Sequence, residues 1–154
     1  SNRAKQVGGN LADGIPVIWG AGILEPVARR WKTQLNENAK VPAYFEALPE
    51  LNHNAVVGIE HPERFVQTVM VVQLTSSYDH PRVQLRHRFT HELYLQQGLL
   101  NETIRAQGKS RLAQQFSLIQ FGDYVSYYLA MVYGADPTPI GPIDTLKGKL
   151  SAAQ

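Results

Sequence analysis

The chain has 154 residues, of which 44% are hydrophobic and 18% charged, a balance typical of one globular domain built around a single core. It contains no cysteine and no run of about 18 apolar residues, which excludes disulfide frameworks, thiolate chemistry and a membrane-spanning helix. A net charge of +2 is too small an excess to predict nucleic-acid binding. We therefore expect a cytoplasmic protein that contacts neither membrane nor nucleic acid.

The first half of the chain alternates short apolar runs with amphipathic segments. Residues 14–20 form an apolar run bounded by glycines, typical of a buried strand, and residues 24–38 repeat apolar side chains at helical spacing. We expect a second, short helix over residues 43–48. After a polar turn, residues 55–59 form another apolar stretch that we treat as a strand.

The second half continues the alternation. The pattern predicts buried strands over residues 65–74 and 99–107, and helices over residues 81–97, 112–131 and 143–150. Strands that alternate with helices at this spacing predict an α/β fold with a mainly parallel sheet. Because such sheets bind ligands at the carboxyl ends of their strands, the loops after Ile18, Ile59 and Leu74 are the first places to search for a site.

We interpret residues 10–154 as a single domain and residues 1–9 as a tag remnant or linker. The chain opens with Ser1 and Asn2 rather than methionine, which indicates processing or a piece excised from a longer polypeptide.

Two titratable residues occupy unusual settings. Glu37 lies between two asparagines at an expected helix end, where a negative charge gains nothing from the helix dipole. His53 lies between two asparagines in the polar turn and can exchange protons near neutral pH. From the residues alone the pair is either a base and an acid awaiting a substrate or two solvated surface groups.

Several long strings of the sequence carry a family resemblance. They are GIPVIWG (14–20), VARRWKTQLNENAK (27–40), LPELNHN (48–54), FGDYVSYYLA (121–130), GADPTPI (134–140) and IDTLK (143–147). Together they resemble the carboxy-terminal half of the bifunctional phosphoglucose/phosphomannose isomerases, over residues 10–150.

The resemblance implies a sugar isomerase (SIS) domain, a three-layer α/β sandwich around a mainly parallel sheet. It also implies interconversion of glucose 6-phosphate or mannose 6-phosphate with fructose 6-phosphate through an enediol, with no metal and no cofactor. Glu37 matches the base that moves the proton between C1 and C2. His53 matches the ring-opening histidine, which the family supplies to the neighbouring subunit's site, so the resemblance implies a homodimer with a shared active site.

Three further residues are site candidates through the same resemblance. Lys147 matches a lysine of the closing helix that would stabilise negative charge near the ring oxygen, although it could be an ordinary solvated lysine. Thr138 and Asn54 are candidates for substrate binding. Thr138 could equally be a turn residue between two prolines.

The sequence also departs from the family pattern. The resemblance assigns phosphate recognition to serine and threonine loops of an amino-terminal SIS copy, the expected partner domain of the same parent chain, which this chain lacks. The loop at residues 20–23 has no hydroxyl group, and we expect residues 75–77 to cap the helix at Pro81 instead. Ala55 stands where relatives carry an acidic residue. The chain alone is therefore predicted to be inactive, and a sugar-phosphate-binding regulatory module or a dimerisation scaffold stays as an alternative.

Two other clusters have less support. His80, His87 and His91 include a pair at helical spacing that could ligate zinc, but the arginines between them favour a solvated basic face. The group Tyr124, Tyr127 and Tyr128 could stack on a sugar, and we favour a protein interface instead.

Overall fold

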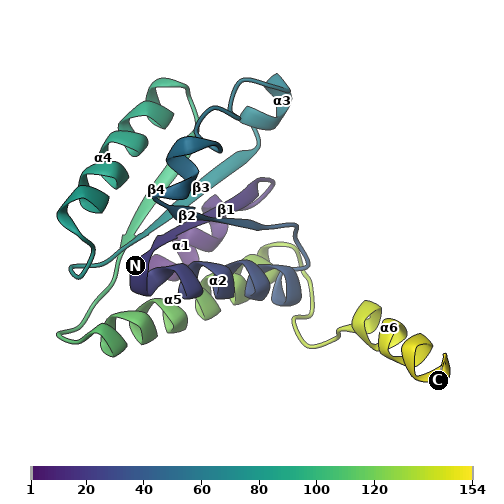
Figure 1. Ribbon diagram of the computed structural model, residues 1–154. Helices are drawn as coiled ribbons and strands as arrows, with labels where there is room; N and C mark the ends of the chain where they lie inside the picture. Colours follow the sequence, from purple (N-terminus) through teal and green to yellow (C-terminus); the bar gives the residue numbers. More distant parts are fainter. Residues whose placement is uncertain (1, 154) are drawn as a thin grey trace.

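The computed structural model describes residues 2–153 and consists of a parallel sheet with helices on both faces (Figure 1). The strands are β1 (Ile15–Ala21), β2 (Tyr44–Leu48), β3 (Val69–Thr75) and β4 (Leu100–Arg105), in the order β2-β1-β3-β4. The helices are α1 (Arg3–Asn10), α2 (Glu25–Asn38), α3 (Glu63–Val66), α4 (Pro81–Gln96), α5 (Arg111–Val132) and α6 (Gly141–Ala152). Two short 3-10 helices, η1 (Gly22–Leu24) and η2 (Glu50–His53), follow β1 and β2. This confirms the predicted three-layer α/β class.

Alternate residues of the central strands point into two separate cores. Ile18 and Val72 belong to the core beneath α1, α2 and α5, whereas Trp19 and Val71 belong to the core on the opposite face, beside α4. Such alternation is what a sheet covered on both faces requires. Since all strands are parallel, every strand begins at one edge of the sheet, here called the amino edge, and ends at the other, the carboxyl edge.

The helix predictions at α2, α4, α5 and α6 are confirmed, as are strands β1 and β4. The predicted stop signals act as expected. Gly98 and Gly134 follow α4 and α5 with φ of +79° and +63°, a conformation that suits glycine. Ser110 caps α5 by accepting a hydrogen bond from the amide of Ala113 at 3.1 Å.

Three predictions about the middle of the chain are wrong. The stretch predicted as a helix over residues 43–48 forms strand β2 instead, because Tyr44 to Leu48 pair in parallel with β1. Residues 55–59 form turns, and their apolar side chains cover the second core instead of entering the sheet. The strand predicted from residue 65 begins at Val69, since residues 63–66 form α3.

The expectation that residues 1–9 are a linker is also wrong for the described part of that stretch. Helix α1 packs against α5, and Val7 is completely buried. A Cβ added to Gly8 would lie 2.9 Å from the carbonyl oxygen of Val125, so the two helices meet at van der Waals contact. Residues 3–9 are therefore part of the folded domain, while Ser1 lies outside the described residues.

Helix α6 stands apart from the body of the domain (Figure 1). All of its residues are exposed, including Ile143, Leu146 and Leu150 on one side of the helix. Within residues 2–153, no helix is long and apolar enough to cross a membrane.

Candidate functional site

Glu37 lies in the last turn of α2, at the amino edge of the sheet, with its side chain exposed. The flanking asparagines fix its backbone. Asn36 donates from Nδ2 to the carbonyl of Val41 at 2.8 Å, and Asn38 donates from Nδ2 to Oγ of the buried Ser126 on α5 at 2.9 Å. The helix end is thereby held while the carboxylate projects into solvent, free to meet a ligand.

The turn that contains Thr138 lies against the same helix end. Lys40 donates from Nζ to the carbonyl oxygen of Glu37 at 2.5 Å and to that of Pro139 at 2.6 Å. Thr138 is exposed, and its amide donates to Oδ1 of Asp136 at 2.9 Å. The structure thus brings Thr138 and Glu37 to one edge. The sequence predictions did not single out Lys40, although a lysine just after a helix is well placed to bind its free carbonyls.

His53 lies at the opposite edge. It ends η2, directly after β2, whereas Glu37 precedes that strand. The five residues of β2 separate the two positions by roughly 15 Å. His53 is exposed, and Asn54 donates from Nδ2 to Oε1 of Glu50 at 3.0 Å. Within one chain the predicted base and the predicted ring-opening histidine do not share a site.

Lys147 lies on the exposed helix α6, away from the body of the domain. Only the turn at residues 133–140 connects this helix to the region of Glu37. The structure therefore places Lys147 on an arm that starts near Glu37, without contact between the two side chains.

The loop after β3 differs from its predicted role. The cap of α4 is His80, whose Nδ1 accepts from the amide of Arg82 at 3.1 Å, so residues 75–77 do not cap this helix. Instead the Ser76 hydroxyl donates to Oε1 of Gln114 at 2.6 Å, and Nε2 of Gln114 donates to the Ser77 hydroxyl at 2.6 Å. Both serine hydroxyls thereby contact one side chain of α5, Ser76 as a donor and Ser77 as an acceptor.

Asp79 closes the same loop. Its Oδ2 accepts from the amide of Ser76 at 2.8 Å. Burial raises the pKa of the Asp79 carboxyl above its ordinary value, and the hydrogen bond from Ser76 opposes part of that shift.

The predicted solvated face of histidines is wrong for His87. This side chain is 5% exposed and lies between α4 and the sheet, with Nδ1 2.9 Å from Oε1 of Gln73. Its Nε2 is buried without a partner in the structure, and burial lowers the pKa of His87 to about 4. His91 bonds instead to Asn101. Among residues 2–153 no group of three or more histidine, aspartate or glutamate side chains could hold a metal.

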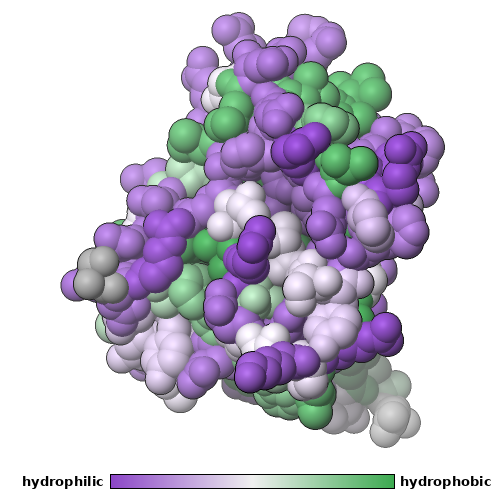
Figure 2. All heavy atoms as spheres, turned by 90° about the vertical axis from the view of Figure 1, so that its left-hand side faces the viewer, coloured by the Kyte–Doolittle hydropathy of each residue, from purple (hydrophilic) through white to green (hydrophobic). Residues whose placement is uncertain are grey.

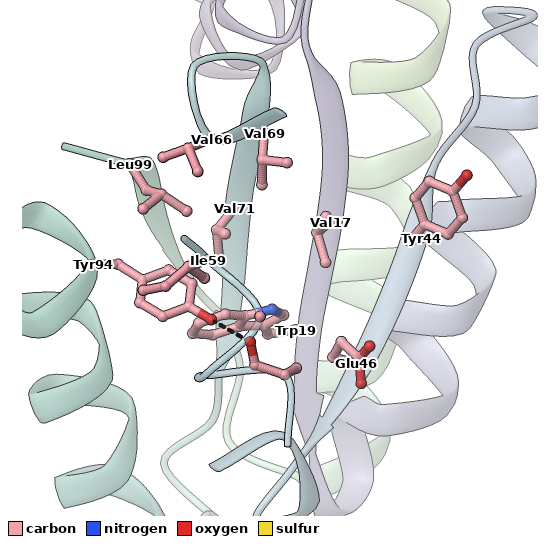
Figure 3. Close-up of a pocket in the computed structure, with 12 residues that line it drawn as sticks. Val17, Trp19, Tyr44, Glu46, Ile59, Val66, Val69, Val71, Tyr94 and Leu99 are labelled. Carbon is pink, nitrogen blue, oxygen red and sulfur yellow. Dashed lines mark hydrogen bonds between the residues drawn. The ribbon is translucent and has the colours of Figure 1, made fainter. Parts of the chain in front are cut away.

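A cavity of about 330 Å³ opens on the second face of the sheet, beneath the turns at residues 55–59 (Figure 3). Two of its lining residues, Trp19 and Tyr94, contact each other edge to face with ring centroids 4.9 Å apart, and the Tyr94 hydroxyl donates to the carbonyl of Ala55 at 3.4 Å. Burial, together with the charge of Glu46, raises the pKa of Tyr94 to about 12. An apolar cavity whose charged side chain is a carboxylate repels a phosphate, so we do not assign the substrate to it.

The carboxyl edge, onto which Figure 2 looks, is polar across its middle, while hydrophobic residues gather toward the top, on the side where α4 faces the viewer. Its loops hold His53 and Asn54, together with Ser76 and Ser77, whose hydroxyls are bonded to Gln114. Within the described residues, Glu37 and Thr138 are the predicted site residues that the fold brings together.

Comparison with solved structures supports the fold. A glucose-6-phosphate isomerase like protein from Thermus thermophilus superposes with a TM-score of 0.73 at 24% sequence identity, over 91% of this chain and 46% of that chain. The class defined by the fold is therefore a three-layer α/β sandwich around a parallel sheet.

Sequence comparison is more specific. A model of the "Bacterial phospho-glucose isomerase C-terminal SIS domain" matches residues 1–150. The bifunctional phosphoglucose/phosphomannose isomerase of Caldicellulosiruptor bescii is 44% identical over 97% of this chain, and that of Aquifex aeolicus is 36% identical over 96%. The chain belongs to the bacterial phosphoglucose isomerase carboxy-terminal SIS domain family. It spans 44% and 46% of the length of these two relatives, respectively.

Proposed function

We propose that this chain is the carboxy-terminal half of an enzyme that converts glucose 6-phosphate and mannose 6-phosphate to fructose 6-phosphate. The observation that carries the proposal is the exposed Glu37 carboxylate, held on a fixed helix end beside the Thr138 turn. The names of the relatives supply the substrates.

In this reaction the Glu37 carboxylate takes the proton from C2 of the open-chain aldose, and the C1 carbonyl oxygen becomes protonated, which gives an enediol. The C2 hydroxyl then gives up its proton and becomes the ketone as Glu37 returns the carbon-bound proton to C1, so the proton gained by the C1 oxygen balances the one lost by the C2 oxygen. One carboxylate can serve both carbons because they are adjacent. Lys147 would stabilise the negative charge that develops on the oxygens, once α6 closes over the bound substrate.

Besides the sugar phosphate substrate, a second partner that we propose is another copy of the chain. His53 and Glu37 lie at opposite edges of one sheet, which supports ring opening by the histidine of a neighbouring subunit. The third partner is the amino-terminal half. Its hydroxyl-bearing loops would bind the phosphate, since in this chain the Ser76 hydroxyl already donates to Gln114 and the Ser77 hydroxyl accepts from the same side chain.

The test is fructose 6-phosphate formation by the parent-length protein from each aldose. Glu37→Gln should lower kcat by about 10²- to 10⁴-fold with little change in KM. Glu25→Gln, at the other end of the same helix and also exposed, is the matched control and should keep its kcat. Full activity of Glu37→Gln would refute the assignment of the base.

Mixing tests the shared site. Glu37→Gln and His53→Ala proteins should each be inactive alone. Because each mixed dimer would rebuild one intact site, unfolding and refolding them together should restore roughly a quarter of the normal activity. No recovery from correctly assembled mixtures would place both residues in the same subunit's site. Binding of sugar phosphate without turnover would favour the regulatory module.

A further inference from the structure

Lys40 has an unusual conformation for a surface lysine. It lies two residues after α2 with a φ of +60°, in the left-handed region that favours glycine. Its ammonium has three donors, and three carbonyl oxygens lie within reach: Glu37 at 2.5 Å, Pro139 at 2.6 Å and Pro137 at 3.4 Å. A residue needed only to end the helix would be glycine or asparagine, so the choice of lysine requires another explanation.

The contacts of Lys40 join segments that are far apart in the sequence. Glu37 belongs to the end of α2, whereas Pro137 and Pro139 flank Thr138 in the turn that leads into α6. Since α6 buries none of its own residues, the position of this turn decides where the helix leaves the domain. Lys40 is thus the link between Glu37, Thr138 and the arm that carries Lys147.

We propose that Lys40 is a positioning residue that holds the turn at residues 137–139 against the end of α2. By doing so it fixes the side from which Thr138 and α6 approach the Glu37 carboxylate. We call the hydrogen bonds from Lys40 to Glu37, Pro137 and Pro139 the tether. The effect of the tether on catalysis rests on the proposed isomerase function, whereas its effect on the position of α6 does not.

The tether can be measured without any activity. The chain has no cysteine, so spin labels at Arg29→Cys on α2 and Thr145→Cys on α6, both exposed positions, report the distance between the two helices. We expect a narrow distance distribution in the otherwise unchanged chain. Lys40→Gly, which keeps the left-handed backbone but removes the ammonium, should broaden it, and Lys40→Arg should keep it narrow. Lys5→Met, at an exposed position on α1, should have no effect. An unchanged distribution in Lys40→Gly would overturn the proposal.

Kinetics of the parent-length enzyme test the consequence. Lys40→Gly should lower kcat at least tenfold with KM nearly unchanged, and Lys40→Arg should recover most of the loss. Normal kcat in Lys40→Gly would refute the positioning role. If the unchanged enzyme forms no fructose 6-phosphate but Lys40→Gly still broadens the distances, the proposed function fails and the tether stands.

Discussion

At the scale of single residues, the Glu37 carboxylate is exposed, whereas the side chains next to it are held by hydrogen bonds. Asn36 and Asn38 hold the helix end through Val41 and Ser126, and Lys40 uses its donors on backbone carbonyls rather than on the Glu37 carboxylate. A carboxylate at a helix carboxyl end is disfavoured by about 0.3–1 kcal/mol. Glu37 therefore contributes nothing to the helix that would explain its presence there, which is consistent with a role toward a ligand.

The buried His87 makes stability depend on pH. Its pKa is about 4 in the folded chain and near the ordinary 6.5 when unfolded. Between these values the unfolded chain binds the extra proton, so stability is fully present above pH 6.5 and falls as the pH drops toward 4. We expect a loss on the order of 3 kcal/mol, measured by urea unfolding at pH 7 and pH 4. His87→Gln should flatten this dependence, and the exposed His61→Gln should not; an equal slope in all three proteins would exclude His87 as its source.

The sequence predicted Glu37 and His53 as candidates but could not predict the environment of His87. Helix α4 turns His87, Thr90 and Tyr94 toward the sheet and leaves Leu85 and Phe89 exposed. Periodicity identifies an apolar stripe on a helix, and an apolar stripe normally faces the core of its own chain. In α4 the apolar residues Leu85 and Phe89 face solvent, so the face that carries His87 was predicted to be solvated although it is buried.

At the scale of elements, close packing between helices depends on single glycines. Trp31 of α2 donates from Nε1 to the carbonyl of Leu118 on α5 at 2.7 Å, and its indole ring packs directly against Gly122. A Cβ at Gly122 would lie 2.3 Å from that ring nitrogen. The contact sets the separation of α2 and α5, and through Asn38 and Ser126 it fixes the helix end that carries Glu37.

Gly122→Ala should therefore destabilise the domain by about 1–3 kcal/mol, because the indole ring must move. The matched control is Gly9→Ala in α1, where a Cβ would meet no atom within 4 Å. This control should be neutral or stabilising by up to about 1 kcal/mol. The free energy of unfolding in urea distinguishes the two. Equal stability of both variants would mean that α2 and α5 can separate without loss.

The sequence predicted helices α2 and α5, because their apolar residues recur at helical spacing, and strand β3, because it is rich in β-branched residues. Strand β2 was not predicted, because Tyr44, Ala47 and Leu48 also fit a helical spacing, and a five-residue edge strand is recognised mainly by its partner β1. Residues 55–59 were wrongly predicted to form a strand for a related reason. They are apolar because they cover a cavity in the second core, a role that no local pattern distinguishes from a strand.

At the scale of the whole molecule, the chain exposes more surface than a compact monomer. Its accessible surface is 9248 Å², whereas a globular protein of 17.2 kDa exposes about 7,800 Å². The excess exceeds the roughly 800 Å² that one partner buries in a standard interface. Part of it lies on α5, where Phe116, Tyr124 and Tyr127 are about half exposed. These residues line a groove of about 820 Å³ that reaches Asn38, beside Glu37.

We expect the amino-terminal half of the parent chain to occupy this groove, since a domain bound there can reach the Glu37 edge. Produced as a separate polypeptide, that half should bind this chain. The combined substitutions Phe116→Ser and Tyr127→Ser should raise the dissociation constant, measured by calorimetry, at least tenfold. The control is Leu85→Ser with Phe89→Ser on the exposed face of α4, which should leave binding unchanged. Loss of binding in the α4 pair alone would assign the amino-terminal half to the opposite face.

The most direct test of the proposed chemistry is the entry of solvent deuterium at C2 of glucose 6-phosphate and mannose 6-phosphate, followed by NMR in the parent-length protein. We predict exchange with both sugars and its loss in Glu37→Gln, because the enediol forms only when this carboxylate removes the C2 proton. Absence of exchange in the unchanged protein, or exchange that persists in Glu37→Gln, would contradict the assignment of Glu37 as the isomerase base.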